Sequence, residues 1–197
     1  MARAAGINMT ECRLLEENGR AHFMTQRFDR LNGNEKVHMQ TLCGIAHYDY
    51  KMLHAYSYEQ AFQVMRRLRL PYSQAEEMFR RMVFNVIARN QDDHTKNISF
   101  LMDKSGRWSL SPAYDMSWSY NPKGAWTAKH QMSINGKWDD ITRADFLTLA
   151  KNVNIKQADA IIEQVKDGVS KWRTFATQYS IPYEMVKAID STLLLGL

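Results

Sequence analysis

Residues 91–115 read QDDHTKNISFLMDKSGRWSLSPAYD, and this stretch carries the most specific signals for fold and chemistry in the chain. The stretch opens with the polar run QDDHTKN, in which four side chains are ionisable. The runs NISFLM and RWSLS come next, and the turn-forming residues DKSG between them predict a β-hairpin. The segment closes with SPAYD. The sequence therefore predicts two polar clusters that a pair of strands connects.

The spacing within these clusters indicates phosphoryl-transfer chemistry. Asp92 and Asn97 form the pattern Asp-x-x-x-x-Asn, with which protein-kinase catalytic loops present a carboxylate to a substrate hydroxyl and an amide oxygen to Mg²⁺. Asp115 comes after the hairpin, where this template requires a second metal-binding carboxylate. We therefore expect Asp92 to orient the hydroxyl, and Asn97 and Asp115 to hold the ion. Lys96 is expected to neutralise charge on the transferred phosphoryl group, and His94 to support the loop or contact the nucleotide.

Two predicted helices precede the polar run. Ser57 is expected to cap the first, and Pro71 ends it because proline lacks a backbone donor. Ser73 and Glu76 have the spacing of a capping box at the head of a second helix over 74–88. The apolar positions of this second helix recur on one face, which predicts that the face is buried. These positions are Met78, Met82, Val83, Val86 and Ile87.

The amino-terminal part of the chain has two local signals. Residues 1–7, MARAAGI, read as the last turn of a helix, because alanine-rich helix formers run directly into a glycine. Asn18-Gly19 lies between two apolar runs, and both central residues of the type I′ turn that this dipeptide favours need a positive φ. An antiparallel hairpin is therefore predicted over 11–17 and 20–28.

The rest of the chain is expected to be mainly helical. Residues 31–42, LNGNEKVHMQTL, read as a polar, turn-rich link. The predicted fold class is α+β, predominantly α, in one domain over 1–197. The carboxyl-terminal helices are expected over 143–151, 156–179 and 182–195, with Thr142 and Asn154 as caps.

Composition narrows the functional classes. A chain of 197 residues, 45% of them hydrophobic, can bury a core, and a net charge of +5 is compatible with a nucleotide, nucleic acid or acidic protein as partner. The 2 cysteines and the histidines are not spaced as metal ligands, which argues against zinc and points to the cytoplasm. No apolar run is long enough to span a membrane. Five arginines form either a solvated helix face or a phosphate-binding patch: Arg66, Arg67, Arg69, Arg80 and Arg81.

Three motifs occur in the order in which one known family carries them. They are Arg-Phe-Asp-Arg at 27–30, Asp-x-His-x-Lys-Asn at 92–97 and Pro-x-Tyr-Asp at 112–115. With these motifs the chain resembles the carboxyl-terminal catalytic region of HipA-like toxin kinases. The resemblance covers nearly the whole chain, from the alanine-rich start to the helical end.

The resemblance implies a fold and an activity. It implies a protein-kinase-like C-lobe, in which residues 1–30 are the last helix turn and hinge hairpin of the N-lobe and residues 31–197 form the mainly helical C-lobe. The implied activity is that of a serine/threonine protein kinase, which transfers phosphate from ATP with Mg²⁺ to a serine hydroxyl of a protein. The implied biological setting is a toxin–antitoxin pair with a HipB-like DNA-binding antitoxin, so that DNA is contacted only indirectly.

The resemblance also implies roles for individual residues. Asp92 would be the catalytic acid/base, and Tyr114 together with Asp115 the second metal-side contact. The hinge strand that lies against the adenine would be Gln26, Arg27 and Phe28. The nucleotide or metal contacts of the loop would be His94, Thr95, Lys96 and Asn97.

One part of the kinase template does not occur in this sequence. No Gly-rich phosphate loop and no strand-borne lysine precede the first helix end. We therefore expect a longer chain or a separate N-lobe polypeptide to supply this half of the site. The isolated chain is expected to have little or no kinase activity.

Two other functions are compatible with the residue types. A metal-dependent phosphoesterase or nuclease would use Asp92, Asp93, His94 and Asp115 around one or two ions, but it leaves Asn97 without a role. A non-enzymatic module would bind nucleic acid or protein through the arginine-rich helices. Asp93 is left open, either as an N-terminal partner or as a structural acid.

Overall fold

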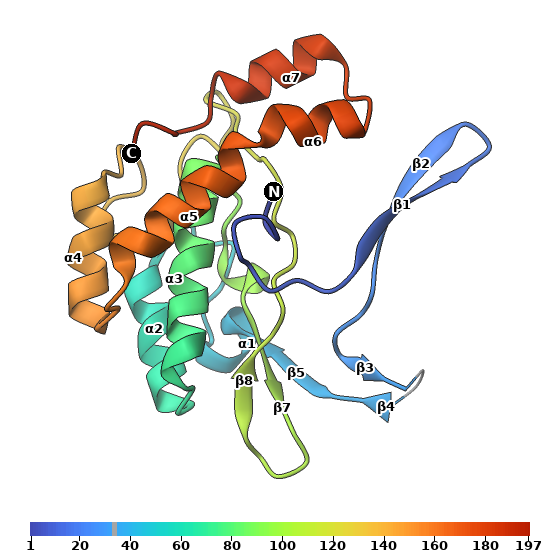
Figure 1. The fold of residues 1–197 in the computed structure, drawn as a ribbon. Coiled ribbons are helices and arrows are strands. Elements are labelled where there is room, and N and C mark those ends of the chain that lie inside the picture. The colour runs from blue at the N-terminus through green and yellow to red at the C-terminus, as the bar shows by residue number, and fades with distance from the viewer. Residues whose placement is uncertain (33–34) are drawn as a thin grey trace.

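The computed structural model describes residues 1–32 and 35–197, and its architecture is α+β, as expected. A helical body is built around the long helix α3, with α2 and α5 beside it, and a small sheet adjoins the body at one end (Figure 1). The hairpin β1–β2 projects away from this body. Within the described residues, no helix is both long and apolar enough to cross a membrane.

The elements have these bounds. The helices are α1 Leu42–Ala46, α2 Tyr58–Arg67, α3 Tyr72–Ile87, α4 Arg143–Val153, α5 Ala158–Ser170, α6 Trp172–Gln178 and α7 Tyr183–Asp190. The strands are β1 Cys12–Glu17, β2 Arg20–Thr25, β3 Arg30–Leu31, β4 Glu35–Lys36, β5 His38–Thr41, β6 Tyr56–Ser57, β7 Ser99–Met102, β8 Trp108–Leu110 and β9 Met132–Ser133.

The projecting hairpin has the predicted turn. Asn18 and Gly19 have φ values of 50° and 72°, which is the conformation that the type I′ turn requires. The register places Leu14 opposite Phe23. The second strand ends at Thr25, three residues earlier than predicted, and residues 26–29 are irregular chain and turn.

The second predicted hairpin is also confirmed, but it belongs to a larger sheet. β7 and β8 pair in antiparallel fashion, and β5 adds to the other edge of β7. The interpretation of 31–42 as a turn-rich link was therefore wrong for most of its described residues, since Leu31 and Glu35–Lys36 pair as β3 and β4 and the last part forms β5. A strand of only 4 residues has a weak local signal, and the partner that orders this strand lies about sixty residues away.

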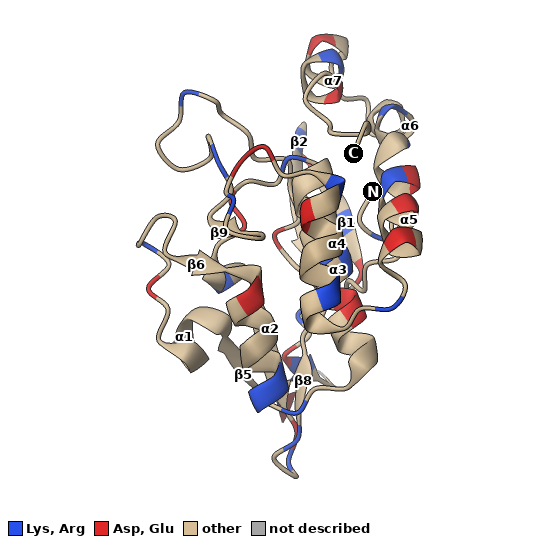
Figure 2. Ribbon diagram, turned by 90° about the vertical axis from the view of Figure 1, so that its left-hand side faces the viewer, with Lys and Arg blue, Asp and Glu red and all other residues tan. Residues whose placement is uncertain are grey.

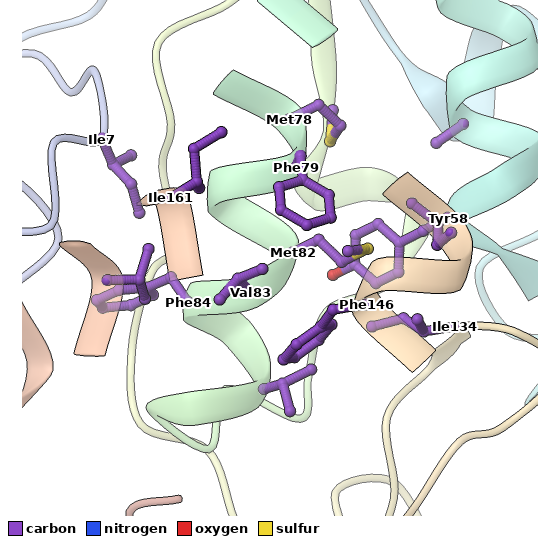
Figure 3. Close-up of a cluster of buried hydrophobic side chains, with 14 of the residues drawn as sticks. Ile7, Tyr58, Met78, Phe79, Met82, Val83, Phe84, Ile134, Phe146 and Ile161 are labelled. Atoms are coloured by element: carbon purple, nitrogen blue, oxygen red, sulfur yellow. The ribbon is translucent and has the colours of Figure 1, made fainter. Parts of the chain in front are cut away.

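The core is centred on the buried face of α3. All the apolar positions predicted to be buried on this helix are buried. Figure 3 shows side chains from other elements around it, among them Ile7, Tyr58, Phe146 and Ile161. Each Å² of apolar surface that α3 buries stabilises the fold by about 25 cal/mol. The helix is therefore held firmly in the core and supports the loop that comes after it.

Two of the predicted caps are correct. Ser57 and Gln60 form a capping box at the start of α2, since the Ser57 hydroxyl accepts from the Gln60 N–H at 3.2 Å. At α4, the Asp145 carboxylate accepts from both the N–H and the hydroxyl of Thr142, at 2.8 and 2.7 Å.

Two predicted caps are wrong. The cap of α3 is Pro71 and not Ser73, because proline before the first turn already has a suitable φ and no donor to satisfy. Asn154 ends α4 with a φ of 65° and does not begin the next helix. The helix predicted over 156–179 is two helices, α5 and α6, and the last helix, α7, ends at Asp190.

The amino-terminal residues form a turn that packs on α5. Gly6 closes it with a φ of 79°, and the Ala5 N–H donates to the Met1 carbonyl at 2.9 Å. Gly168 of α5 lies against this turn so closely that a Cβ there would be 2.5 Å from the Ala5 nitrogen. The turn and α5 can therefore adopt this arrangement only with glycine at position 168.

We predict that Gly168→Ala destabilises the protein by about 1–3 kcal/mol, because the added methyl group meets backbone atoms that cannot move away. Gly44→Ala in α1 is the matched control, since its Cβ would make only an ordinary contact of 3.5 Å with Thr41. The control is expected to be neutral or stabilising by up to ~1 kcal/mol, as for other helical sites. Urea unfolding measures both. A Gly168→Ala variant as stable as the control would contradict the packing of the turn on α5.

Candidate functional site

The polar run lies in a loop between α3 and β7. Arg89, with a φ of 55°, turns the chain out of the helix, and a short 3₁₀ turn over Thr95–Asn97 leads into the strand. The Asn97 N–H donates to the His94 carbonyl at 2.9 Å inside this turn. The loop is thus anchored at both ends on elements that belong to the core.

Asp93 fixes the middle of the loop. The residue is 2% exposed, and its carboxylate accepts hydrogen bonds from the Tyr58 hydroxyl at 2.8 Å, from His130 Nδ1 at 2.9 Å and from the Gln131 N–H at 2.8 Å. A buried carboxylate is tolerated only with such a set of donors. Of the two roles considered for Asp93, an N-terminal partner or a structural acid, these hydrogen bonds favour the structural acid.

The hydrogen-bonded chain continues from Asp93 to Asp115. Tyr58 accepts from the Asn85 amide at 2.9 Å, and the Asn90 amide donates to Asn85 Oδ1 at 3.0 Å. The same Asn90 amide donates to the backbone carbonyl of Asp115 at 3.2 Å. Burial, together with the nearby charge of Asp93, raises the pKa of Tyr58 well above its usual value. One buried network of hydrogen bonds thus fixes the loop around Asp93 and the segment around Asp115 relative to each other.

Asn97 and Asp115 line the same narrow cleft, which has a volume of about 20 Å³ and also includes His94. The Asn97 side-chain nitrogen donates to the Asp92 carbonyl at 2.9 Å, which leaves the amide oxygen as the atom available to a ligand. Asp115 is exposed and has a φ of 57°. The Asp92 carboxylate lies beside the cleft, 3.9 Å from His94 Nε2 and 44% exposed.

Tyr114 connects the loop to the segment that carries Asp115. Its hydroxyl donates to the Lys96 carbonyl at 2.5 Å and is also hydrogen-bonded to Ser99 on β7. Its ring packs against Phe28 with the centroids 5.6 Å apart. Burial raises the pKa of Tyr114. Phe28 and Tyr114 are therefore neighbours, although 86 positions separate them in the chain.

Three loop residues predicted to contact the nucleotide make protein contacts. The Thr95 hydroxyl is buried and donates to the Tyr48 carbonyl at 3.1 Å, so the structure gives it no surface for a ligand. Lys96 Nζ lies 4.3 Å from the centre of the Tyr50 ring. The His94 ring also packs edge-on against Tyr50.

The predicted hinge strand is not a strand. Gln26 and Arg27 come after the end of β2 as irregular chain, and Phe28 begins a turn. Arg27 forms a two-pronged ion pair with Asp29 at 2.8 and 2.7 Å, which lowers the pKa of that carboxyl. The Gln26 N–H donates to the Glu11 carbonyl at 2.9 Å. Of these three residues, Phe28 contacts a residue of the site, because its ring packs on Tyr114.

The donor set fits Mg²⁺ better than it fits zinc. Within 1–32 and 35–197, no three His, Cys, Asp or Glu side chains are arranged to hold a metal ion. Magnesium usually takes one or two protein oxygens and completes its shell with phosphate and water, which the Asn97 amide oxygen and the Asp115 carboxylate can satisfy. Asp93 has its oxygens occupied, and it is therefore not free to act as a metal ligand.

Several residues of this site could not be identified from the sequence. Asn85, Asn90, His130 and Gln131 support the loop, but no spacing relates them to it. The one available signal is Asn85, a polar residue within the apolar stripe of a predicted buried helix.

We predict that Tyr58→Phe destabilises the protein by about 1–3 kcal/mol at pH 7, because Asp93 loses a donor and Asn85 loses an acceptor. Folding raises the pKa of Tyr58, so the hydroxyl contributes its full share to the free energy of unfolding below pH ~10, and this share is lost as the pH rises further. The difference in free energy of unfolding between the wild type and Tyr58→Phe should therefore become smaller above that pH. Urea unfolding at several pH values tests this, with exposed Tyr179→Phe as the control.

Comparison with known proteins adds family information. Residues 1–172 match the model of the HipA-like C-terminal domain. A curated relative, "Putative kinase Y4mE" of Sinorhizobium fredii, is 22% identical over 206 residues, covering 98% of this chain and 43% of the relative. A solved structure, the complex of HipA, HipB and operator DNA from a toxin–antitoxin system of Shewanella oneidensis MR-1, contains a similar chain. The TM-score is 0.76 at 18% identity, and the match covers 98% of this chain and 52% of the chain in the complex. The chain thus spans about half the length of these two proteins. Because the family model covers most of its residues, the chain belongs to the HipA-like C-terminal domain family.

Proposed function

We propose that the chain is the catalytic C-terminal portion of a HipA-like serine/threonine protein kinase, a toxin that transfers phosphate from Mg-ATP to a serine of a protein. The observation that carries the proposal is the shared cleft of Asn97 and Asp115, with the carboxylate of Asp92 beside it. In the kinase template, two oxygen ligands hold the ion and a separate carboxylate orients the hydroxyl. The protein-kinase-like C-lobe remains part of this proposal.

Each residue in or beside the cleft has a separate task in this proposal. Within the described residues, Asp92 forms no ion pair shorter than its 3.9 Å approach to His94, and it can accept or orient the proton of an incoming hydroxyl. Asn97 and Asp115 would hold Mg²⁺, which supplies charge neutralisation at the phosphate oxygens. Lys96 would leave the Tyr50 ring to reach the phosphoryl group, since its side chain is exposed.

The nucleotide would lie between this cleft and the segment after β2. Phe28, packed on Tyr114, offers an apolar surface for the adenine, and Gln26 and Arg27 adjoin it. Tyr114 would act by holding Phe28 and the Lys96 carbonyl in place.

The rest of the kinase would come from the half that this chain does not cover. The hairpin β1–β2 exposes apolar side chains on both faces, among them Leu14, Leu15 and Phe23. A two-stranded hairpin is marginal alone in water, so we assign this surface to the N-lobe, from the same or a separate polypeptide. A HipB-like DNA-binding antitoxin is the proposed partner, and DNA would be contacted only through it. We place the protein in the cytoplasm.

The two rival functions have weaker support. A phosphoesterase that uses Asp93 as a ligand conflicts with the three hydrogen bonds that this carboxylate accepts. The arginine-rich helices do not form one free basic face: Arg81 is buried, paired with Glu77 and bonded to the Ser111 carbonyl, and Arg80 donates to Ala5. Figure 2 shows Lys and Arg scattered over several elements.

We predict that Asp92→Asn lowers phosphate transfer from γ-labelled Mg-ATP by roughly 100- to 10,000-fold, because the amide cannot accept the proton of the hydroxyl. The assay requires the chain joined to, or co-expressed with, an amino-terminal half. The exposed Asp167→Asn, which only breaks an ion pair with Lys171, is the control and should keep full activity. Full activity in Asp92→Asn would contradict the role of Asp92 as the residue that accepts or orients the hydroxyl proton.

We predict that Asp115→Ala and Asn97→Ala each raise the Mg²⁺ concentration for half-maximal activity by at least about tenfold, since each removes a metal ligand. Asp103→Ala, in the turn of the β7–β8 hairpin, should leave this concentration unchanged. A loss of activity that extra Mg²⁺ does not relieve would argue against ligation and for a purely structural role.

A further inference from the structure

The segment that follows α1 contacts three consecutive residues of the polar loop. The Tyr48 carbonyl accepts from the Thr95 hydroxyl at 3.1 Å. The Tyr50 ring packs edge-to-face against the His94 ring with the centroids 5.4 Å apart, and Lys96 Nζ lies over the Tyr50 ring, 4.3 Å from its centre. One short piece of chain therefore holds this whole part of the loop.

This piece of chain is itself firmly placed. The Tyr48 N–H donates to a carbonyl of α1 at 3.0 Å, and the Tyr48 ring stacks on Tyr56 of β6 with the centroids 4.6 Å apart. Asp49 closes a local turn, since its carboxylate accepts from the Lys51 N–H at 3.0 Å. The helix, the strand and the turn together present the Tyr50 ring to the loop.

The aromatic ring of Tyr50 makes both of its contacts with the loop. The face of an aromatic ring attracts an ammonium group, because the π electrons make the face negative. Lys96 is exposed, and a free lysine side chain on the surface samples many rotamers. The ring therefore restricts a cation that would otherwise have no fixed position, and a phenylalanine ring can do the same.

We propose that Tyr50 is a positioning residue of the candidate site, whose ring keeps the Lys96 ammonium group and the His94 ring beside the cleft. His94 lines the cleft together with Asn97, which is next to Lys96 in the chain. The ammonium group therefore starts from one position when it moves to the phosphoryl group, and not from an ensemble of rotamers. This role rests on the proposed kinase function, because Tyr50 acts through Lys96.

NMR of the chain with ¹³C-labelled lysine tests the contact without any need for activity. Protons over the face of an aromatic ring resonate upfield, so the ε-methylene signal of Lys96 should lie upfield of those of the other exposed lysines. The loss of this signal in Lys96→Arg assigns it. The signal should stay in place in Tyr50→Phe and join the other lysines in Tyr50→Leu. A Lys96 signal without the upfield shift, or one that Tyr50→Leu leaves unmoved, would overturn the contact.

Phosphate transfer from γ-labelled Mg-ATP tests the role, with the chain joined to, or co-expressed with, an amino-terminal half. Tyr50→Leu should lower kcat by roughly 3- to 30-fold and change the KM for ATP by less than about twofold, because the ring acts on Lys96 and not on the proposed adenine surface at Phe28. Tyr50→Phe should keep the wild-type kcat, since it retains the ring. The exposed Tyr183→Leu on α7 makes the same chemical change elsewhere and should also keep it.

The outcomes separate this role from the proposed function. Equal kcat values for Tyr50→Leu and Tyr50→Phe would overturn the positioning role and leave the kinase proposal intact. A fall in kcat that only follows the folded fraction, measured by urea unfolding, would overturn it as well. No phosphate transfer by the unmodified protein would contradict the proposed function and with it the role of Tyr50, whereas the upfield signal of Lys96 would still be observed.

Discussion

The buried carboxylate of Asp93 is the interaction on which the site depends. Three donors from two other parts of the chain converge on it, from α2 and from residues 130 and 131. Without them a carboxylate in this position would be too costly to keep charged. Because Asp93 is next to Asp92 in the chain, the hydrogen bonds that fix the first carboxylate also fix the backbone of the second. An unreactive residue thus determines where the proposed catalytic one lies.

Local signals allowed a large part of the fold to be predicted. Asn18-Gly19 specified its turn through the φ values that it needs, Ser57 and Thr142 were recognised as caps, and α3 was predicted from the period of its apolar residues. The errors lie where the deciding partner is distant. β5 is ordered by its pairing with β7. Asn154 was predicted to begin a helix, but asparagine is also suited to the left-handed conformation at the end of a helix, and here it ends α4.

The same distinction applies to the site. The spacing of Asp92, Asn97 and Asp115 is a local pattern and could be read directly, and two of the three line one cleft. Thr95 and Arg27 carried the right residue types, but a distant backbone carbonyl occupies Thr95 and the nearby carboxylate of Asp29 occupies Arg27. Tyr58, Asn85 and His130 contribute through burial, and burial of single polar residues is decided only by the assembled core.

The parallel pairing of β6 with β9 has a consequence for how the chain folds. Tyr56 lies beside Met132, although about seventy-five residues separate them, and β5 and β7 are joined over a similar distance. Closing loops of this size is slow compared with forming helices or hairpins. The contacts that surround the polar loop are therefore expected to form after α3 and the two hairpins. A newly made chain would pass through a state with native helices but no assembled site, so the proposed active site is complete only when the topology is complete.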